Sequence, residues 1–411
     1  MGDVVKLATP ARRGRRSRTA LVLGGGGFTG AVYEIGALRA LDLLSVNRTV
    51  NDFDIYVGTS AGSLVAAFTA NGITPEQMMR VVNGQKPLPF GDVDLGTLLR
   101  PNYREFLARG IKLPIHLAGL ARSVGRGLGS FSTVDLGIAL LEALPSGLYS
   151  GRGVEKYVRS VLAGHGRTDD FRELGKELYL AATDLDTCER IVLGAEGWDD
   201  IPISTAVRAS AALPMVYEPV RVNDRELVDG GIVSTTNLDI AVEAGAKLIV
   251  VVNPLVPYVN DFTKEIPTLL GTRVRRVSDM GFPKIAYQTF KLVAYQRLHE
   301  MARQWQERYP GVDIVLIEPD PDDELMFQTS ILNYGSRLDV ARHGFQSVTV
   351  KLAADYEQLR EVCHRHGIEI SATRVRKVVR HFSDGEPEKR RAWRRILEQT
   401  TGALLRQSAA D

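Results

Sequence analysis

The sequence predicts an α/β protein in three layers, in which helices cover both faces of a mostly parallel central sheet and a helical C-terminal extension follows. Short apolar segments at 19–23 and 54–60 each end in a glycine-containing turn and lead into a helical pattern. Residues 246–254, AKLIVVVNP, form a nearly unbroken apolar run, typical of a strand that is buried on both faces. Strands that alternate with helices, together with such a strand, indicate a parallel α/β sheet.

The first two units of the chain show this alternation most clearly. The segment TALVL at 19–23 stops at glycines, and residues 31–45 then carry apolar side chains at three-residue steps, as in a helix. Residues 54–60 resemble a second buried strand, and the alanine-rich segment 61–72 is typical of a buried helix that Gly72 ends. Each unit therefore predicts a strand, a tight turn and a helix.

The rest of the chain continues the pattern with one irregular insertion. We expect strands at 177–186, 189–194, 215–222, 225–229 and 312–319, and helices at 202–212, 265–308 and 326–366. Residues 84–150 are irregular, with glycines and prolines, which predicts a cap or lid over the core. The chain thus divides into a disordered basic arm at 1–18, a core domain at 19–320, and a helical C-terminal extension with a basic tail at 321–411.

Composition indicates a globular protein, and the net charge differs in sign between the parts of the chain. The chain has 411 residues, of which 44% are hydrophobic and 24% charged. No run of about 18 apolar residues is present, which excludes a transmembrane helix by this criterion. The net charge of +2 combines +5 at 1–18, +5 at 371–411 and −8 at 19–370. We expect a cytoplasmic protein with an acidic body between two basic extensions.

The basic tail suggests one partner. The segment KRRAWRR at 389–395 places Arg391, Arg394 and Arg395 beside Trp393, which is compatible with peripheral contact with an anionic membrane surface. A solvated helix face packed on the core is the alternative interpretation. Nucleic acid is not an expected partner, because aromatic residues are sparse among the basic ones. The sequence leaves the oligomeric state open.

The cysteines predict neither a disulfide scaffold nor a metal site. Cys188 and Cys363 lie 175 positions apart and belong to no CxxC or Cys/His ligand pattern. We therefore expect two packing thiols in a reducing compartment.

The loop GGGGFTG joins the first strand to its helix. Because Gly25, Gly26 and Gly27 lack a Cβ, their N–H groups can converge on an anion at the start of the helix. Two other interpretations remain open. Gly25, Gly27 and Gly30 match the dinucleotide-binding pattern GxGxxG, and the loop is also compatible with a merely tight turn.

The dinucleotide interpretation lacks one expected feature. Such a unit places a ribose-binding acid at the end of its second strand. Here Asp52 and Asp54 precede the second strand, and its end is occupied by VGTS. The sequence therefore disfavours a dinucleotide site.

The motif GTSAG matches GxSxG at a strand-to-helix junction. Gly58 and Gly62 permit the strained turn that exposes Ser60 as a nucleophile. The helix 61–72 directs the positive end of its dipole at Ser60, and the Ala61 N–H follows the serine. We expect the N–H groups of Gly25, Gly26, Gly27 and Ala61 to form an oxyanion hole.

A nucleophilic serine needs a base, and none of the seven histidines falls at a recognisable strand end. Asp229 does, because it follows the strand segment RELV, and Gly230 and Gly231 behind it allow a neighbouring turn to come close. Ser60 follows only the second strand of the chain, which also disfavours a serine–aspartate–histidine order. An acid in an ordinary β-turn is the alternative interpretation of Asp229.

Taken in order, GGGGFTG, GTSAG and DGG resemble the oxyanion, nucleophile and dyad-aspartate motifs of the patatin-like phospholipase family. The segments at 208–220 and 241–254 also resemble that family, and the similarity covers about 19–320. It implies the patatin-like three-layer fold and an acyl hydrolase domain there. Two positions depart from the family pattern, since Gly24 stands where an acid is often found and Thr29 where a basic residue is usual.

The resemblance implies a phospholipase A-like or lysophospholipase-like enzyme that acts on lipids with a long acyl chain. Ser60 would attack the acyl carbonyl, and Asp229 would take its proton and pass it to the leaving alcohol before water cleaves the acyl-enzyme. The resemblance implies neither a metal nor an organic cofactor. A weakly active or inactive lipid-binding module on the same fold is the alternative, which Thr29 favours, and a nucleotide-binding oxidoreductase is a more remote one.

Overall fold

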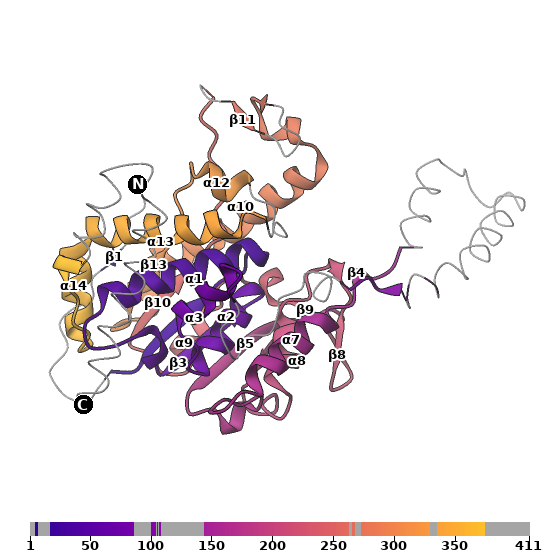
Figure 1. The fold of residues 1–411 in the computed structure, drawn as a ribbon, viewed down its shortest axis with the longest axis horizontal. Coiled ribbons are helices and arrows are strands. Elements are labelled where there is room, and N and C mark those ends of the chain that lie inside the picture. Colours follow the sequence, from indigo (N-terminus) through magenta and orange to yellow (C-terminus); the bar gives the residue numbers. More distant parts are fainter. Residues whose placement is uncertain are drawn as a thin grey trace, which may run out of the picture.

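The computed structural model describes residues 5–6, 17–85, 100–103, 105, 107, 144–262, 265–267, 273–328 and 335–374. These residues form a central sheet in the strand order β1-β13-β10-β2-β3-β5-β9-β8, and β6 also pairs with β5 (Figure 1). The strands are β1 (Val5–Lys6), β2 (Thr19–Leu23), β3 (Ile55–Thr59), β5 (Glu177–Asp184), β6 (Arg190–Leu193), β8 (Val220–Val222), β9 (Arg225–Asp229), β10 (Leu248–Val252) and β13 (Asp313–Ile317).

The middle of the sheet is parallel and its margins are antiparallel. Strands β13, β10, β2, β3 and β5 pair in parallel, whereas β1, β6, β8 and β9 add antiparallel ladders. The strand β10 is fully buried along its length, as the apolar run at 246–254 predicted. The α/β prediction with a mostly parallel sheet is confirmed.

Helices cover both faces of the sheet, so the fold has three layers. On one face lie α1 (Gly27–Leu44), α2 (Ala61–Ala70), α3 (Pro75–Val82), α7 (Arg152–Leu162), α8 (Ile203–Ser210) and α13 (Arg337–Ala354). On the other face lie α9 (Leu238–Glu243), α10 (Phe282–Arg303) and α11 (Trp305–Arg308). Leu21 and Leu23 of β2 point into the first layer, while Ala20 and Val22 point into the second.

The C-terminal helices α13 and α14 (Tyr356–Arg365) share one core cluster with α1 and the central strands. The helix α13 packs directly against α1 where two glycines meet, because a Cβ on Gly36 would lie 2.5 Å from the carbonyl oxygen of Ala341. A Cβ on Gly344 would likewise lie 2.7 Å from the carbonyl oxygen of Tyr33. The helical extension is completed by α12 (Glu324–Gln328). The prediction of a helical C-terminal region is confirmed.

The structure corrects the helix expected at 265–308. Only α10 and α11 are α-helical there, and the preceding residues form the short strands β11 (Ile266–Pro267) and β12 (Arg273–Val274) and the 3₁₀ turn η4 (Val277–Met280). Gly281 takes a φ of 80° before α10 begins, and Pro283 follows in the first turn of that helix. A left-handed residue followed by a proline ends one element and starts the next, so the expected helical structure is present from Phe282 onward and is wrong for β11 and β12.

Two further expectations meet the structure only in part. The segment 215–222 is divided into β7 (Met215–Tyr217) and β8, and β7 pairs with β4 (Gly147–Tyr149) outside the main sheet. In the arm expected to be disordered, Val5 and Lys6 pair with β13.

Most of the expected cap at 84–150 and the tail beyond residue 374 lie outside the described residues. Within the described ranges, no helix is long and apolar enough to cross a bilayer.

Candidate active site

Ser60 lies in the sharp turn between β3 and α2. Its backbone has φ 55° and ψ −124°, an uncommon conformation for a residue other than glycine. The turn is crowded on both sides, since a Cβ on Gly58 would come within 2.6 Å of the Ser63 Cα and one on Gly62 within 2.5 Å of the Leu23 carbonyl oxygen. The two glycines of GTSAG are therefore required because the turn packs tightly on β2 and on its own helix.

Asp229 reaches Ser60 from the antiparallel margin of the sheet. Residue Asp229 ends β9 and stands opposite Ala182 of β5, while Ala181 stands opposite Thr59 of β3. This register brings two residues that are 169 positions apart into contact. The Ser60 Oγ donates a hydrogen bond of 2.5 Å to the Asp229 Oδ2.

The carboxylate of Asp229 is deeply buried, with only 2% of the residue exposed. Burial raises the pKa of Asp229 from 3.8 to about 6, while the hydrogen bonds from Ser60 and from the Gly231 N–H partly oppose that rise. The Gly231 N–H donates to Oδ1 over 2.7 Å. Gly230 packs against the sheet, because a Cβ there would lie 2.3 Å from the Ala181 carbonyl oxygen. The pKa of this acid is therefore close to neutral pH, as suits a general base.

The backbone N–H groups of the glycine loop differ in whether they already donate a hydrogen bond. The Gly25 N–H donates to the carbonyl oxygen of Thr235 over 2.9 Å, so it is already engaged. Among the described residues, the N–H groups of Gly26, Gly27 and Ala61 have no hydrogen-bond acceptor. Gly26 and Gly27 open α1, and Ala61 opens α2, so these donors stand at the positive ends of two helices.

Other predicted motif residues support the loop. The Cβ position of Gly25 lies 3.4 Å from the Ser60 Cβ, which places the loop directly beside the serine. A Cβ on Gly30 would meet the Pro254 side chain at 3.1 Å. Thr29, the departure from the family pattern, is 5% exposed in the first turn of α1. The structure thus brings the glycine loop, the GTSAG turn and the DGG turn together at one edge of the sheet.

Two polar residues that the motifs did not indicate also hold the site. The Ser60 N–H donates to the Ser210 Oγ over 3.0 Å, and that hydroxyl donates in turn to the Ala181 carbonyl oxygen over 2.6 Å. Asn237 donates its side-chain amide to the Thr59 Oγ1 over 3.0 Å. The only sequence signal for Ser210 was its place in the RASAALPM segment, which carried no role for the side chain.

The described histidines serve other parts of the structure. Three of the described histidines pair with acids outside the dyad, His299 with Glu318, His343 with Asp323 and His366 with Asp313. Among the described residues, no cluster of three or more His, Cys, Asp or Glu side chains is arranged to hold a metal ion. Of the acids weighed for a dinucleotide site, Asp52 bonds to Thr49 and Asp54 to Thr19.

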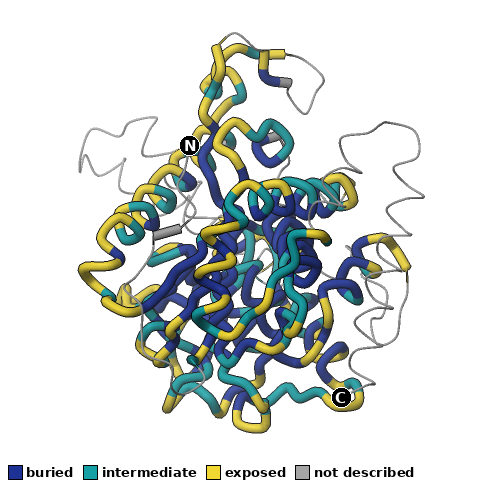
Figure 2. The backbone as a smooth tube through the Cα atoms, turned by 90° about the vertical axis from the view of Figure 1, so that its left-hand side faces the viewer, coloured by how far each residue is buried: buried dark blue, intermediate teal, exposed yellow. Residues whose placement is uncertain are grey.

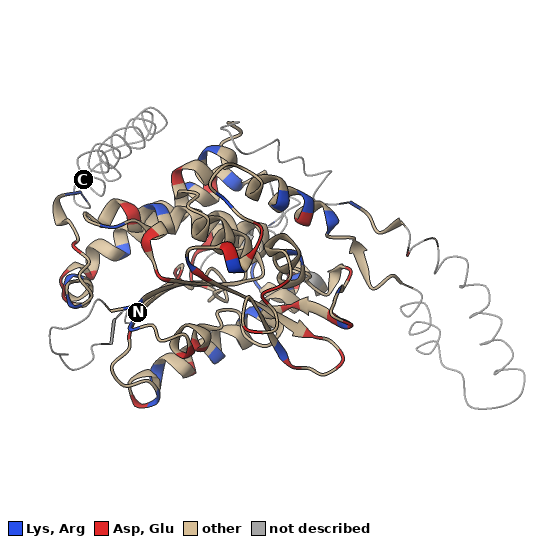
Figure 3. Cartoon of the chain, turned by 90° about the horizontal axis from the view of Figure 1, so that it is seen from below, with Lys and Arg blue, Asp and Glu red and all other residues tan. Residues whose placement is uncertain are grey.

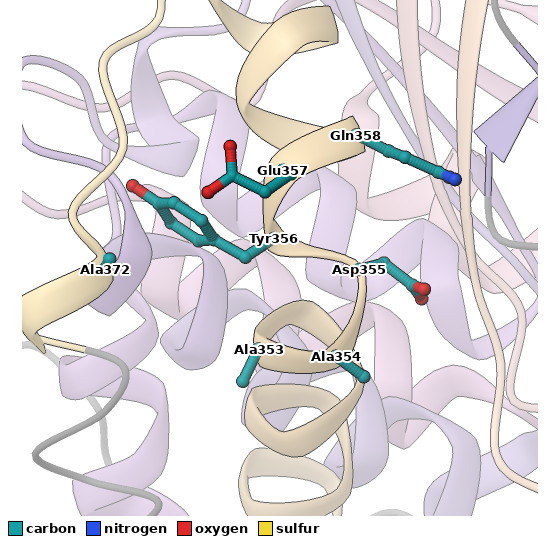
Figure 4. Close-up of a pocket in the computed structure, with 7 residues that line it drawn as sticks. All are labelled: Ala353, Ala354, Asp355, Tyr356, Glu357, Gln358 and Ala372. Atoms are coloured by element: carbon teal, nitrogen blue, oxygen red, sulfur yellow. The ribbon is translucent and has the colours of Figure 1, made fainter.

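A surface hollow of about 360 Å³ is present elsewhere, at the junction of α13 and α14 (Figure 4). Its lining includes Asp355, Tyr356 and Glu357, and Tyr356 donates its hydroxyl to the Ile370 carbonyl oxygen over 3.0 Å. All of its lining residues come from 353–358 and Ala372. The hollow is therefore separate from the Ser60–Asp229 pair.

The arrangement at the sheet edge has the parts that acyl transfer needs. A serine hydroxyl is bonded to a buried carboxylate, and the nearby N–H groups of Gly26, Gly27 and Ala61 have no acceptor in the described part of the chain. Such donors can stabilise the negative charge that develops on a carbonyl oxygen under attack.

Comparison with known proteins agrees with this chemistry. The chain is 25% identical over 223 residues to the probable lipid hydrolase 463L of Invertebrate iridescent virus 6, which covers 54% of this chain and 63% of that protein. It is 27% identical over 222 residues to the uncharacterized protein YqhO of Bacillus subtilis, with 50% and 64% covered. The chain thus matches less than two thirds of the length of either relative.

Among solved structures, VipD from Legionella pneumophila is similar with a TM-score of 0.39 and 15% identity, over 86% of this chain and 70% of that chain. The model of the patatin-like phospholipase family matches residues 21–242, which include GGGGFTG, GTSAG and DGG. Because that match spans more than half of the chain and its three motifs meet at one site, the chain belongs to the patatin-like phospholipase family.

Proposed function

We propose that the protein is a lipid acyl hydrolase that cleaves carboxylic esters of long-chain lipids, as a phospholipase A or lysophospholipase does. The observation that carries this proposal is the 2.5 Å hydrogen bond from the Ser60 Oγ to the buried Asp229 carboxylate. Family membership supports ester hydrolysis of a lipid, and the dyad supplies the chemistry for it.

In the proposed reaction, the Ser60 Oγ attacks the acyl carbonyl while its proton passes to the Asp229 Oδ2. The tetrahedral oxyanion accepts hydrogen bonds from the N–H groups of Gly26, Gly27 and Ala61, which are unpaired among the described residues. The engaged N–H of Gly25 would join them only if its bond to Thr235 opened. Asp229 then returns the proton to the leaving alcohol, and water hydrolyses the acyl-enzyme by the same route in reverse.

An aspartate can serve as the base here because its surroundings oppose its charge. With a pKa of about 6, Asp229 is ionised at neutral pH yet accepts a proton more readily than an exposed aspartate. We expect the second-order rate of Ser60 acylation to rise with pH through about 6, since only the ionised carboxylate can take the proton.

Around this dyad we propose the following organisation. Residues 19–320 form the acyl hydrolase domain, and the insertion at 84–150 serves as its cap. The helices of 321–374 are integral to the hydrolase core, since α13 packs on α1 behind the glycine loop. Ile232 is exposed three residues after Asp229, which leaves apolar surface for an acyl chain at the rim.

Labelling with a fluorophosphonate probe tests the dyad. We expect a covalent adduct that peptide mapping places on Ser60, and no adduct in Ser60→Ala. Asp229→Asn should slow labelling by about 100-fold or more, because the serine loses its base but keeps a hydrogen-bonding neighbour. The labelling rate of the wild-type protein should also follow the ionisation of Asp229.

Ser160→Ala is the matched control, because Ser160 is exposed on α7 and its hydroxyl bonds only to the Tyr157 carbonyl oxygen. This variant should label as the wild-type protein does. An adduct that persists in Ser60→Ala, or a rate unaffected by Asp229→Asn, would contradict the dyad. A wild-type protein that binds lipid but never labels would instead favour a non-catalytic lipid-binding module.

A further inference from the structure

A projection that contains β11 stands above α10 and α12 in Figure 1. It begins after β10, whose last residue Val252 pairs with Leu23 and accepts the Gly24 N–H. It continues through β11, β12 and η4 and returns in the first turns of α10. The projection therefore rises from the immediate neighbourhood of the glycine loop.

The projection has a small core of its own, which leaves other apolar side chains outside. The ring of Tyr258 stacks on Phe327 at 4.3 Å between centroids, and Ile266 is buried with them. Phe262 is nevertheless 74% exposed and Phe282 81% exposed. Figure 2 shows that many residues of this projection are exposed. Since the small core is already formed, the two exposed rings are not needed to fold it.

The exposed apolar surface continues along α10 toward the dyad. Phe282, Ile285, Leu292 and Val293 are exposed and fall on one face of the helix by their spacing. The same face ends at Arg297, whose guanidinium donates to the Val233 carbonyl oxygen, four residues after Asp229. Exposed apolar residues thus recur along this face of α10, with the exposed polar residues Thr289 and Gln296 between them.

The same projection also carries exposed cationic residues, in and next to β12. Arg273, Arg275 and Arg276 are exposed, and in the part of the chain that the structure describes none of them forms an ion pair. Residues 259–285 hold five basic and three acidic residues, against a net −8 for 19–370 as a whole.

Elsewhere on the body, basic and acidic side chains are interspersed (Figure 3). Pairing is common there, as where Arg208 contacts both Glu155 and Glu218. The projection contains three acidic residues. Asp279 accepts a hydrogen bond from the Arg276 backbone N–H, and Asp261 also has an interaction partner. Glu265 is exposed. Among the described residues, the guanidinium groups of these three arginines form no ion pair, so they are available to an external anion.

We propose that this docking surface, made of Phe262, Phe282, Ile285, Leu292 and Val293 with Arg273, Arg275 and Arg276, rests on an anionic lipid bilayer. Exposed aromatic rings enter the acyl boundary while arginines contact lipid phosphates, which is the combination that favours interfacial binding. Contact along α10 turns the Ser60 edge toward the membrane. The role of this docking rests on the proposed function, because a lipid ester substrate lies in the bilayer. The binding itself requires no catalysis.

Flotation of the full chain with vesicles tests the docking surface without a catalytic readout. We expect the wild-type protein to float with vesicles of phosphatidylcholine and phosphatidylglycerol, and less with phosphatidylcholine alone. Phe262→Ala combined with Phe282→Ala should lower partitioning by about 10-fold or more. Replacing Arg273, Arg275 and Arg276 by Gln should lower binding to anionic vesicles by about 100-fold and change binding to neutral ones little.

Val350→Ala on α13 and Arg360→Gln on α14 are matched controls, because both residues are exposed away from the projection. They should bind as the wild-type protein does. All variants should keep the wild-type unfolding temperature and the same hydrolysis of a short water-soluble ester. If the double variant fails to fold, the single variant Phe282→Ala, which changes a largely exposed ring, still measures the loss of vesicle binding.

If the phenylalanine and arginine variants floated with vesicles as well as the wild-type protein does, the proposal would be overturned. Vesicle binding would then belong to another part of the chain. A wild-type dimer in solution that the phenylalanine substitutions dissociate would overturn the proposal too, because the docking surface would then be an interface between two copies. Vesicle binding without ester hydrolysis would leave the docking surface intact and contradict only the proposed function.

Discussion

The two turns that bring the dyad together carry different kinds of strain. Ser60 has a strained backbone, with φ 55° for a residue that is not glycine, but its side chain is partly exposed. Asp229 has an ordinary backbone, with φ −50° and ψ 129°, but its carboxylate is buried and its pKa is raised to about 6. One turn is conformationally strained, and the other is electrostatically strained.

This difference explains why the two turns are built differently. The Ser60 turn is held by close backbone packing, since Gly58 and Gly62 press against their neighbours and Ser63 donates its N–H to the Ser60 carbonyl oxygen. The Asp229 carboxylate is held by hydrogen bonds from Ser60 and Gly231. Each kind of strain should therefore respond to a different substitution, and stability measurements can separate them.

The largest expected effect comes from removing the charge of Asp229. Asp229→Asn should raise the free energy of unfolding at pH 8 by about 3 kcal/mol, because a carboxyl pKa raised by about two units opposes folding by that amount once ionised. The gain is absent below about pH 4, where the carboxyl is protonated in both states, and grows as the pH rises to about 6. Urea unfolding at several pH values measures it.

Asp184 provides a control of opposite sign. Its bond to Arg225 lowers the pKa of Asp184 to about 2, so its ionised form supports the folded state. Asp184→Asn should therefore destabilise the protein at neutral pH, and the loss should shrink as the pH falls toward 2. If Asp229→Asn and Asp184→Asn shifted stability in the same direction at pH 8, the electrostatic strain assigned to Asp229 would be wrong.

Both turns could be located from sequence, because short motifs at strand ends depend on local chemistry. Gly58, Gly62 and Gly230 mark close backbone approaches that a side chain would obstruct, and the structure places Ser60 and Asp229 in contact. The engagement of the Gly25 N–H by Thr235 could not be read in this way. It depends on how segments distant in sequence pack at the sheet edge, as does the bond from the Ser60 N–H to Ser210.

The α-helical structure expected over 265–308 is absent before Gly281 for a related reason. Its residues have helix-compatible composition, but Gly281 and Pro283 interrupt the chain, and β11 pairs with β12 across Ile266 and Val274. Pairing between two short segments is a tertiary preference that overrides local propensity. The projection that results could be recognised only once the exposure of its side chains was known.

The next largest effect concerns the packing that holds the Ser60 turn. Gly62→Ala should lower the free energy of unfolding by about 2 kcal/mol, because the new methyl group would lie 2.5 Å from two carbonyl oxygens, those of Leu23 and Gly24. Gly175→Ala is the control, since a Cβ there meets nothing within 4 Å. Chemical denaturation of both variants measures the difference, and equal stability would show that the turn is not held by backbone crowding.

The smallest expected effect isolates the conformational strain at Ser60 itself. Ser60→Gly and Ser60→Ala both remove the hydroxyl and leave Asp229 without its serine partner, so the comparison between them cancels that loss. Glycine adopts positive φ without steric cost, whereas alanine keeps the strain of φ 55°. The glycine variant should therefore be more stable than the alanine variant by about 1 kcal/mol, after the greater entropy of unfolded glycine is included. Denaturation at pH 5 and pH 8 should give the same difference, because backbone strain does not titrate. A difference that changed with pH would instead assign the effect to the Asp229 carboxylate, and the separation of the two kinds of strain would fail.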